Sequence, residues 1–348
     1  MTTSTADAAL RRAVRAIALG LALLAAGCAP TLQPMGPRIG PPAITDQAFR
    51  AADGTLLPMK RWLPEAAPTA VILALHGFND YSNAFDAAGR YWAQHGVATY
   101  AYDQRGFGRS GRPGIWPGTE TMVADLLDAA AALRVLHPDR PLYLLGESMG
   151  GAVIMAALAG RDLPPGVDGA ILSAPAVWSR DTMPFYQRWA LFAAGWTVPW
   201  MELRPPRNLN IRPSDNIEML RALGRDPLVI KSTRVDAVRG LTDLMDTAME
   251  SAAAFGVPSL VLYGANEQVI PKVPREKAMA RFPTAPAPDA GPRLALYDDG
   301  WHMLLRDLQA EVVWRDVLAW IGDRAAPLPS GADAHDAVAE LRGGVGAE

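Results

Sequence analysis

Apolar residues gather along the chain in short continuous runs, and each run ends in a turn. These runs cover residues 70–77, 97–108, 141–148, 169–175, 259–266 and 293–300. Stretches with helical periodicity alternate with them, at 84–95, 119–136, 150–160, 241–255, 272–282 and 303–322. Buried strands that alternate with helices predict an α/β fold, a mostly parallel sheet with helices on both faces. Residues 46–64 add a predicted hairpin that turns at Asp53 and Gly54.

Residues 177–240 interrupt the alternation, because they separate two strands by far more than a crossover connection needs. We interpret this segment as an inserted cap. Within it, Phe185, Trp189, Phe192 and Trp196 recur at helical spacing, which places four aromatic side chains on one face of one helix. Two interpretations stay open. Either these rings pack the cap onto the main domain, or Trp189, Phe192 and Trp196 bind the acyl chain of a substrate.

The N-terminal residues predict a targeting segment. Arg11, Arg12 and Arg15 precede an apolar run at 16–27, which is too short to span a bilayer. The run ends at Cys28 in a sequence that resembles a bacterial lipobox, where the cysteine is lipidated. We therefore expect a lipoprotein signal peptide at 1–27 and lipidation of Cys28, with a plain secretory signal as the alternative. By resemblance to Gram-negative lipoproteins, Ala29 favours anchoring in the cell envelope, on the outer membrane facing the periplasm.

The other segments divide the chain further. Residues 28–44 are rich in proline and glycine, which predicts a tether without regular structure. Residues 45–325 then form the main domain with its cap. Residues 326–348 are small, acidic and low in complexity, and we expect this tail to be mostly disordered.

Composition removes several classes of function. The chain has 348 residues, half of them hydrophobic, and a net charge of −3. It has no basic patch, so a nucleic-acid partner is not expected. Its one cysteine, Cys28, allows neither an internal disulfide nor a cysteine-based metal site. We predict neither a metal nor a cofactor.

The stretch "GESMG" at 146–150 joins the end of a predicted strand to the start of a helix. A sharp strand-to-helix turn strains the backbone of its central residue and needs glycine on both sides. Such an elbow exposes Ser148 as a nucleophile. A glycine-rich turn with an idle serine is the alternative, so the chain must also supply a base, an acid and an oxyanion hole.

The loops after the last two predicted strands supply the other two candidates. His302 follows the final strand, at the same carboxyl edge of the sheet as Ser148, and is the predicted base. Glu267 follows the preceding strand and is the predicted acid, which holds the imidazole and stabilises its protonated form. Asp181, after an earlier strand, is the alternative acid. The chain order of Ser148, Glu267 and His302 is that of α/β-hydrolases.

The oxyanion hole needs two backbone N–H groups that point at the developing negative charge. Met149, directly after the nucleophile, is one candidate. Phe78, in the loop after the 70–77 strand, is the other, and His76 is expected to brace that loop rather than to act in catalysis.

Four stretches now resemble one branch of a known family. His76-Gly77-Phe78, "YDQRGFGRSGR" (102–112), "GESMGG" (146–151) and "YGANEQVIP" (263–271) are similar to the monoacylglycerol lipase and lysophospholipase branch of the α/β-hydrolases. That branch overlaps with the serine aminopeptidase S33 family. The resemblance implies the triad, an oxyanion hole at Phe78 and Met149, a cap after the sixth strand, and a structural turn with Asp103 and Arg105. Family members usually have aspartate where this chain has Glu267.

The expected activity follows from the residues and the resemblance together. We expect a carboxylic ester hydrolase that acts on monoacylglycerol-like or lysophospholipid-like esters. Acyl transfer to an alcohol is a close variant, and an S33-type peptidase is a further alternative. From a different class, the chain could be a non-catalytic, lipid-binding envelope lipoprotein.

Overall fold

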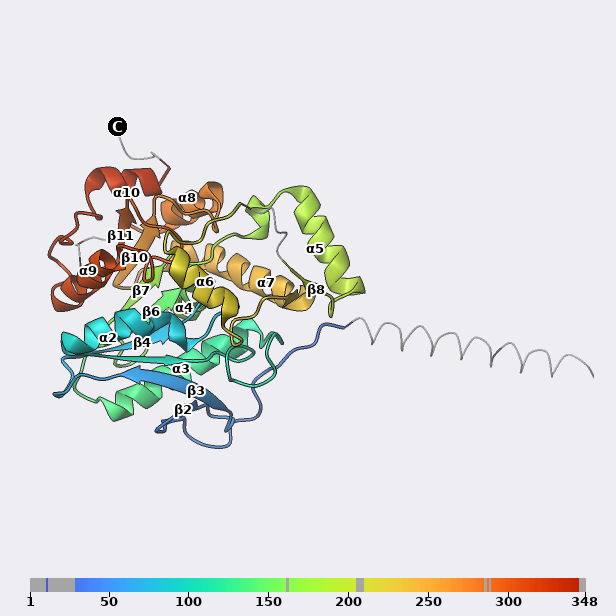
Figure 1. Ribbon diagram of the computed structural model, residues 1–348, viewed down its shortest axis with the longest axis horizontal. Coiled ribbons are helices and arrows are strands. Elements are labelled where there is room, and N and C mark those ends of the chain that lie inside the picture. The colour runs from blue at the N-terminus through green and yellow to red at the C-terminus, as the bar shows by residue number, and fades with distance from the viewer. Residues whose placement is uncertain are drawn as a thin grey trace, which may run out of the picture.

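The apolar runs form the centre of one sheet in the computed structural model, which describes residues 11, 29–160, 163–204, 210–284, 287 and 289–343. The strand order within this part is β1-β2-β3-β5-β4-β6-β7-β10-β11 (Figure 1). The antiparallel strands come first: β1 (Ala43–Ile44), β2 (Ala48–Arg50) and β3 (Leu56–Trp62). The parallel strands are β4 (Ala70–Leu75), β5 (Val97–Tyr102), β6 (Leu142–Glu147), β7 (Gly169–Ser173), β10 (Ser259–Gly264) and β11 (Pro292–Tyr297).

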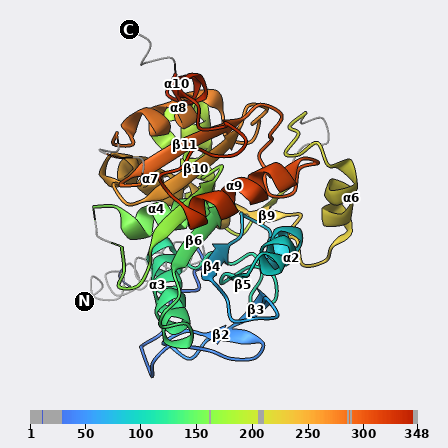
Figure 2. The same cartoon turned by 90° about the vertical axis from the view of Figure 1, so that its left-hand side faces the viewer.

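Helices cover both faces of the sheet, which explains why its central strands are apolar throughout (Figure 2). One face packs against α3 (Thr119–Leu136), α4 (Met149–Leu158) and α7 (Val235–Ser251). The other packs against α2 (Asp86–Gln94) and α9 (Ala310–Gly322). α8 (Lys272–Arg281) and the short 3-10 helices η1 (Ser82–Phe85) and η3 (Ala252–Ala254) complete this body. The predicted α/β-hydrolase architecture is confirmed.

The expected insertion lies between β7 and β10. It contains η2 (Arg180–Thr182), α5 (Phe185–Thr197), β8 (Glu202–Leu203), α6 (Ile217–Arg225) and β9 (Thr233–Arg234). Figure 1 shows α5 at the outer edge of the molecule, away from the sheet. Two helix starts were predicted wrongly. α7 begins at Val235 rather than 241, because its buried positions start there, and α9 begins at Ala310 rather than 303, because residues 302–309 form turns.

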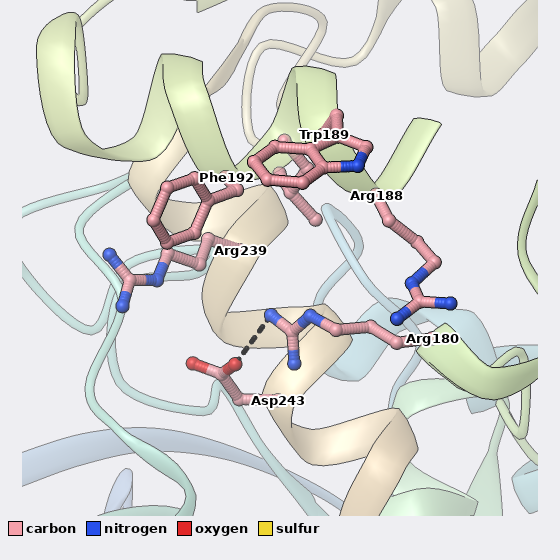
Figure 3. A pocket seen from close by; sticks show the side chains of 7 residues that line it. Arg180, Arg188, Trp189, Phe192, Arg239 and Asp243 are labelled. Carbon is pink, nitrogen blue, oxygen red and sulfur yellow. Dashed lines mark hydrogen bonds and ion pairs between the residues drawn. The ribbon is translucent and has the colours of Figure 1, made fainter. Parts of the chain in front are cut away.

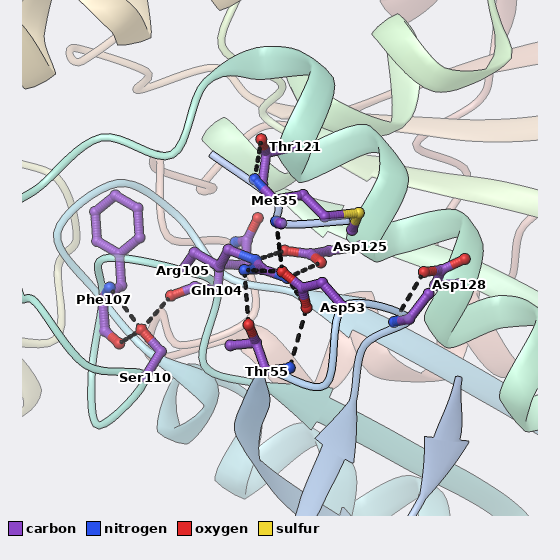
Figure 4. A network of polar contacts seen from close by, with 12 residues as sticks. Met35, Asp53, Thr55, Gln104, Arg105, Phe107, Ser110, Thr121, Asp125 and Asp128 are labelled. Carbon is purple, nitrogen blue, oxygen red and sulfur yellow. Dashed lines mark hydrogen bonds and ion pairs between the residues drawn. The ribbon is translucent and has the colours of Figure 1, made fainter. Parts of the chain in front are cut away.

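Residues 29–42, here called the N-terminal strap, lack regular helix or strand, as expected. They are nevertheless fixed to the domain by hydrogen bonds that their backbone amides donate. The amide of Gly36 donates to Asp53 at 2.9 Å and that of Met35 to Thr121 at 3.1 Å (Figure 4). Leu32 forms a bridge with Trp116. A proline-rich segment has few amide donors, and here several of them find acceptors on the domain.

Asp53 also belongs to a buried network around Arg105 (Figure 4). The Arg105 guanidinium donates to Asp53 at 2.9 Å and to Asp125 at 2.6 Å. Asp103 accepts from the amides of Ser82 and Arg109. These contacts confirm the structural turn expected for Asp103 and Arg105, and they join the strap, the β2–β3 turn and α3.

The expectation of a mostly disordered tail is wrong for residues 326–343. This segment contains α10 (His335–Leu341) and packs against the edge strand β11. Leu328, Ala332 and Leu341 are buried, and the Ala332 carbonyl accepts a bond of 2.8 Å from the Leu296 amide. Scattered apolar residues in a low-complexity sequence thus cover a sheet edge that would otherwise be open.

No helix in the part of the chain described here has the length and apolar character that crossing a bilayer requires. Cys28 and most of the predicted leader lie outside the described residues. The predicted lipidation and the signal peptide therefore stay predictions.

Candidate active site

Ser148 stands at the turn between β6 and α4. Its backbone is left-handed, with φ 52° and ψ −111°, and its amide donates to the Ser173 carbonyl at 2.9 Å. The neighbouring glycines are required by close packing. A Cβ on Gly146 would lie 2.4 Å from the Gly150 carbonyl carbon, and a Cβ on Gly150 would lie 2.1 Å from the Leu75 oxygen. The local geometry is therefore that of a strained nucleophile elbow.

His302 and Glu267 meet in the loops after β11 and β10. The His302 Nδ1 lies 2.7 Å from Glu267 Oε2, and both side chains are buried. The second oxygen of Glu267 accepts from the amides of Val269 at 2.6 Å and Ile270 at 3.0 Å. The carboxylate is thus held from both sides, and Nδ1 must carry the proton that it donates. Among the residues that the structure describes, none is hydrogen-bonded to Nε2 of His302, which is therefore available to accept a proton.

The two groups favour each other's charged forms. Burial by itself would lower the pKa of His302, but the Glu267 carboxylate raises it above the usual value for histidine. Burial likewise would raise the pKa of Glu267, but His302 and the two backbone amides bring it below its usual range. Glu267 therefore stays ionised and can stabilise an imidazolium when His302 takes up a proton.

Asp181, the alternative acid, has other partners. One carboxylate oxygen accepts from the Ser179 hydroxyl, and the other lies 2.5 Å from the Lys277 amine. The structure brings Glu267 to His302, although family members usually have the shorter aspartate there. The longer glutamate side chain reaches the imidazole while its second oxygen is fixed by its own loop.

The loop after β4 lies beside the elbow. A Cβ on Gly77 would lie 3.5 Å from the Ser148 Cβ, so Phe78 directly follows a residue that packs against the nucleophile. His76 Nε2 accepts from the Gln104 amide at 3.0 Å, and its Nδ1 therefore donates to the Gly77 carbonyl at 2.8 Å. Burial lowers the pKa of His76, which keeps it neutral. The expected bracing role of His76 is confirmed.

Arg306 was missed by the sequence reasoning, yet it links three loops of the site. Its guanidinium lies 2.7 Å from Asp80, in the loop after Phe78, and 2.5 Å from Glu147, directly before the nucleophile. Arg306 itself is four residues after His302 and is buried. The only sequence signal was a charged residue inside the apolar stretch "WHMLLRDL" (301–308). One buried cation thus fixes the relative positions of the oxyanion, nucleophile and histidine loops.

A cap segment is attached to the same histidine loop. The Met303 amide donates to the Pro213 carbonyl at 3.0 Å, and the Ser214 hydroxyl donates to Asp307 at 2.6 Å. Arg212 stacks on the Trp301 ring, 4.8 Å from its centroid. Burial raises the pKa of Asp307 to about 6, above its usual range. Residues 212–214 therefore form a fixed attachment of the cap, in contrast to α5.

Comparison with known proteins places this geometry in a family. The model of the family named "Serine aminopeptidase, S33" matches residues 66–309. The chain belongs to this family. A monoacylglycerol lipase of Mycolicibacterium smegmatis is 26% identical over 286 residues, which cover 80% of this chain and 96% of that protein. Human monoglyceride lipase is 24% identical over 280 residues, 79% of this chain and 89% of that protein.

Solved structures show the same fold. A soluble variant of monoglyceride lipase from Saccharomyces cerevisiae, in complex with a substrate analogue, superposes with a TM-score of 0.67 at 18% identity. The match covers 84% of this chain and all of that one. A monoacylglycerol lipase of Paleococcus ferrophilus gives a TM-score of 0.61 at 18% identity, over 77% of this chain and 99% of that one. The predicted resemblance to the S33 and monoacylglycerol lipase branch is confirmed, and the chain is a carboxylic ester hydrolase of that branch.

The aromatic residues of the cap helix α5 had two possible roles, packing onto the main domain or binding an acyl chain. Phe185, Trp189, Phe192 and Trp196 are 74, 68, 58 and 50% exposed, so they are not buried between the cap and the main domain, although the Trp196 ring stacks on Arg239 of α7. Only Gly195 of α5 is buried, against Arg239 of α7. The spacing correctly predicted one shared helix face, and Trp189 and Phe192 on that face line an open cavity between α5 and α7 (Figure 3). Substrate binding by Trp189, Phe192 and Trp196 stays a prediction.

Proposed function

We propose that the chain hydrolyses carboxylic esters through an acyl-enzyme on Ser148. The observation that carries the proposal is the buried bond between His302 Nδ1 and Glu267, at the same sheet edge as a strained elbow. A pair of this kind is suited to take a proton from a serine hydroxyl, which is a poor nucleophile without a base.

In this mechanism, Ser148 Oγ attacks the ester carbonyl while His302 Nε2 takes its proton. Glu267 stabilises the imidazolium that results. The amides of Phe78 and Met149 donate to the negative oxygen of the tetrahedral intermediate. His302 then gives its proton to the leaving alcohol, which departs and leaves the acyl group on Ser148. Water, activated by His302, attacks this ester and releases the acid and free Ser148.

The proposed substrates are single-chain acyl esters of the monoacylglycerol or lysophospholipid type. Relatives named as monoacylglycerol lipases support this choice over a peptide. The exposed aromatic face of α5 supports contact with an apolar acyl chain. The proposed location is the bacterial cell envelope, with a lipid on Cys28 that anchors the enzyme to the outer membrane.

Active-site labelling tests the chemistry directly. A fluorophosphonate should modify the full chain once, and peptide mapping should place the adduct on Ser148. Labelling at another serine, or none in a folded protein, would contradict the proposal.

A substrate panel then separates the alternatives. It includes monoacylglycerols, lysophosphatidylglycerol and aminoacyl amides, each with and without an added alcohol acceptor. Free fatty acid as the main product supports hydrolysis. A new ester as the main product would assign acyl transfer, and amide cleavage would assign a peptidase.

A further inference from the structure

The cap returns from α6 to α7 through residues 226–234, here called the return segment. Hydrogen bonds join this segment to the loop after β4, residues 76–81, which contains the proposed oxyanion donor Phe78 and is here called the oxyanion loop. The bonded residues are 145 or more positions apart in the chain. The mechanism described above uses none of these bonds, so they need a physical explanation.

Asn79 binds the return segment through both its backbone and its side chain. The Ile230 amide donates to the Asn79 carbonyl at 2.9 Å, and the side-chain amide of Asn79 donates to the Thr233 hydroxyl at 2.7 Å. The Tyr81 hydroxyl donates to the Asp226 carboxylate at 2.7 Å. Burial and this carboxylate raise the pKa of Tyr81, so the phenol stays protonated and keeps donating. Three bonds along the return segment therefore fix it to the oxyanion loop.

The backbone of Asn79 is left-handed, with φ 64°. The Asp80 amide donates to the Gly77 carbonyl at 3.3 Å, which closes a four-residue turn. Phe78 and Asn79 are the two central residues of this turn, and a positive φ at the second of them favours glycine or asparagine. Because Phe78 lies inside the turn, a change in the conformation of Asn79 would redirect the Phe78 amide.

The Phe78 amide is available to a substrate. Among the described residues, none accepts a hydrogen bond from it. The Phe78 ring is held by the main domain, with its centroid 5.7 Å from that of Phe107 and 6.2 Å from that of Trp116. The main domain therefore holds the side chain of Phe78, whereas the cap holds Asn79, the residue that follows it.

The return segment is itself held in place on both sides. Thr233 belongs to β9, where it pairs with Leu203 of β8. At the start of α6, the Asn216 side-chain amide donates to the Arg306 carbonyl at 3.0 Å. α6 and the return segment thus connect the loop that carries His302 with the oxyanion loop.

We propose that the return segment positions the oxyanion hole, with Asn79 and Thr233 as the positioning residues. The inference rests on the proposed function, because it takes the Phe78 amide as an oxyanion donor. Loss of one such donor lowers turnover by about two to three orders of magnitude. A donor that stays present but points less accurately should cost less. In this role, Asn79 and Thr233 do not contact the reacting atoms and act through the Phe78 amide.

The first test removes the acceptor of the Asn79 side chain. Thr233→Val keeps the branched shape of the side chain but loses its hydroxyl. The kcat for p-nitrophenyl esters should fall by about tenfold or more. KM should change by less than about twofold, because an oxyanion donor acts on the transition state more than on the bound ester.

Two matched variants control this result. Thr233→Ser keeps a hydroxyl at the same position and should retain most of the wild-type kcat. Ser232→Ala removes the neighbouring hydroxyl, which bonds Glu202 within the cap, and should leave kcat unchanged.

A double substitution tests whether Asn79 and Thr233 act as a pair. Asn79→Gly keeps the left-handed backbone accessible but removes the side-chain bond. Its kcat should fall at least as far as that of Thr233→Val. Adding Thr233→Val to Asn79→Gly should then lower kcat by less than about a further twofold, because the shared bond is already lost. Losses that multiply would show that the two residues act independently and would overturn the pairing.

A tetrahedral mimic supplies a measurement that a purely structural role would not change. Octylboronic acid binds Ser148 Oγ through its boron while the serine proton passes to His302, which leaves a tetrahedral anion on the serine. Its inhibition constant should rise by about tenfold in Thr233→Val, because a boronate oxygen takes the oxyanion position. The uncharged ether 1-O-octylglycerol should compete equally well in the variant and the wild type.

Failure of this inference and failure of the proposed function give different results. A folded wild type that neither hydrolyses esters nor is labelled at Ser148 would contradict the proposed function. A wild type that hydrolyses esters, beside a Thr233→Val variant with unchanged kcat and unchanged boronate affinity, would contradict the positioning role alone. Equal weakening of the boronate and the ether would show a loosened substrate pocket instead, and an equal loss of kcat in Ser232→Ala would show general damage to the cap. Either result would also overturn the positioning role.

Discussion

The loop that carries His302 and the cap helix α5 differ in how their side chains are held. His302, Glu267 and Arg306 are buried, and each has at least one charged or hydrogen-bonded partner at 2.7 Å or closer. Along α5, only Gly195 is buried, and its large aromatic side chains are at least half exposed. Proton transfer needs fixed distances, whereas contact with lipids tolerates many arrangements of an apolar surface. The two regions therefore should respond to substitution in different ways.

Removing the nucleophile should have the largest effect. Ser148→Ala should lower ester hydrolysis by about three orders of magnitude or more and abolish fluorophosphonate labelling, because no acyl-enzyme can form. Hydrolysis of p-nitrophenyl esters measures the loss. Ser232→Ala, a serine on the cap that bonds Glu202, is the control and should keep its activity. Labelling that survives Ser148→Ala would disprove the assignment.

The acid should matter nearly as much. Glu267→Gln should lower turnover by about two to four orders of magnitude, because a neutral amide no longer stabilises the imidazolium and can hold the wrong tautomer. Asp181→Asn should lose much less, since Asp181 contacts Ser179 and Lys277 rather than His302. Steady-state kinetics of both variants decide whether Glu267 or Asp181 is the acid. The reverse order of losses would move the acid to Asp181.

These two predictions depend on residues that the sequence itself identified. Ser148, Glu267 and His302 were found because each follows an apolar run, and the carboxyl ends of parallel strands meet at one edge. Arg306 was not found, because its partners Asp80 and Glu147 are more than 150 residues away and no local pattern marks a buried ion pair. The exposure of the aromatic face of α5 was also hidden. Helical spacing shows that four rings share a face, but not what the face contacts.

The buried cation should be needed for stability as well as for rate. Arg306→Gln leaves the carboxylates of Asp80 and Glu147 without their shared partner, and breaking a buried pair in this way costs about 3–5 kcal/mol. Chemical denaturation measures the change in the free energy of unfolding. Arg315→Gln, which alters an exposed pair with Glu311 on α9, should change it by less than about 1 kcal/mol. Equal losses of unfolding free energy in the two variants would show that the buried ion pairs of Arg306 contribute no more to stability than an exposed pair does.

The pH profile of ester hydrolysis should report on the pair of His302 and Glu267. His302 must be neutral to accept a proton, and Glu267 raises its pKa, so kcat/KM should fall on the acid side at a pH above the usual histidine value of about 6.5. Glu267→Gln removes that charge, which should lower the pKa of His302 and move this limb to lower pH. The residual hydrolysis of an activated ester is sufficient for the measurement. If the acid limb of Glu267→Gln stays at the pH of the wild type, a group other than His302 controls it.

The smallest effect should come from the exposed cap. Trp189→Ala should change the free energy of unfolding by less than about 1 kcal/mol, because the indole is 68% exposed and its removal opens no cavity in the core. Trp320→Ala is the matched comparison. That indole is buried against the sheet beside Tyr143, and its truncation should cost about 3–5 kcal/mol. Binding and stability should then separate at Trp189, since the proposed contact with the acyl chain of the substrate would be lost while the fold stays intact. If Trp189→Ala destabilised the chain as much as Trp320→Ala, α5 would be part of the core, and its aromatic face would need no ligand to explain it.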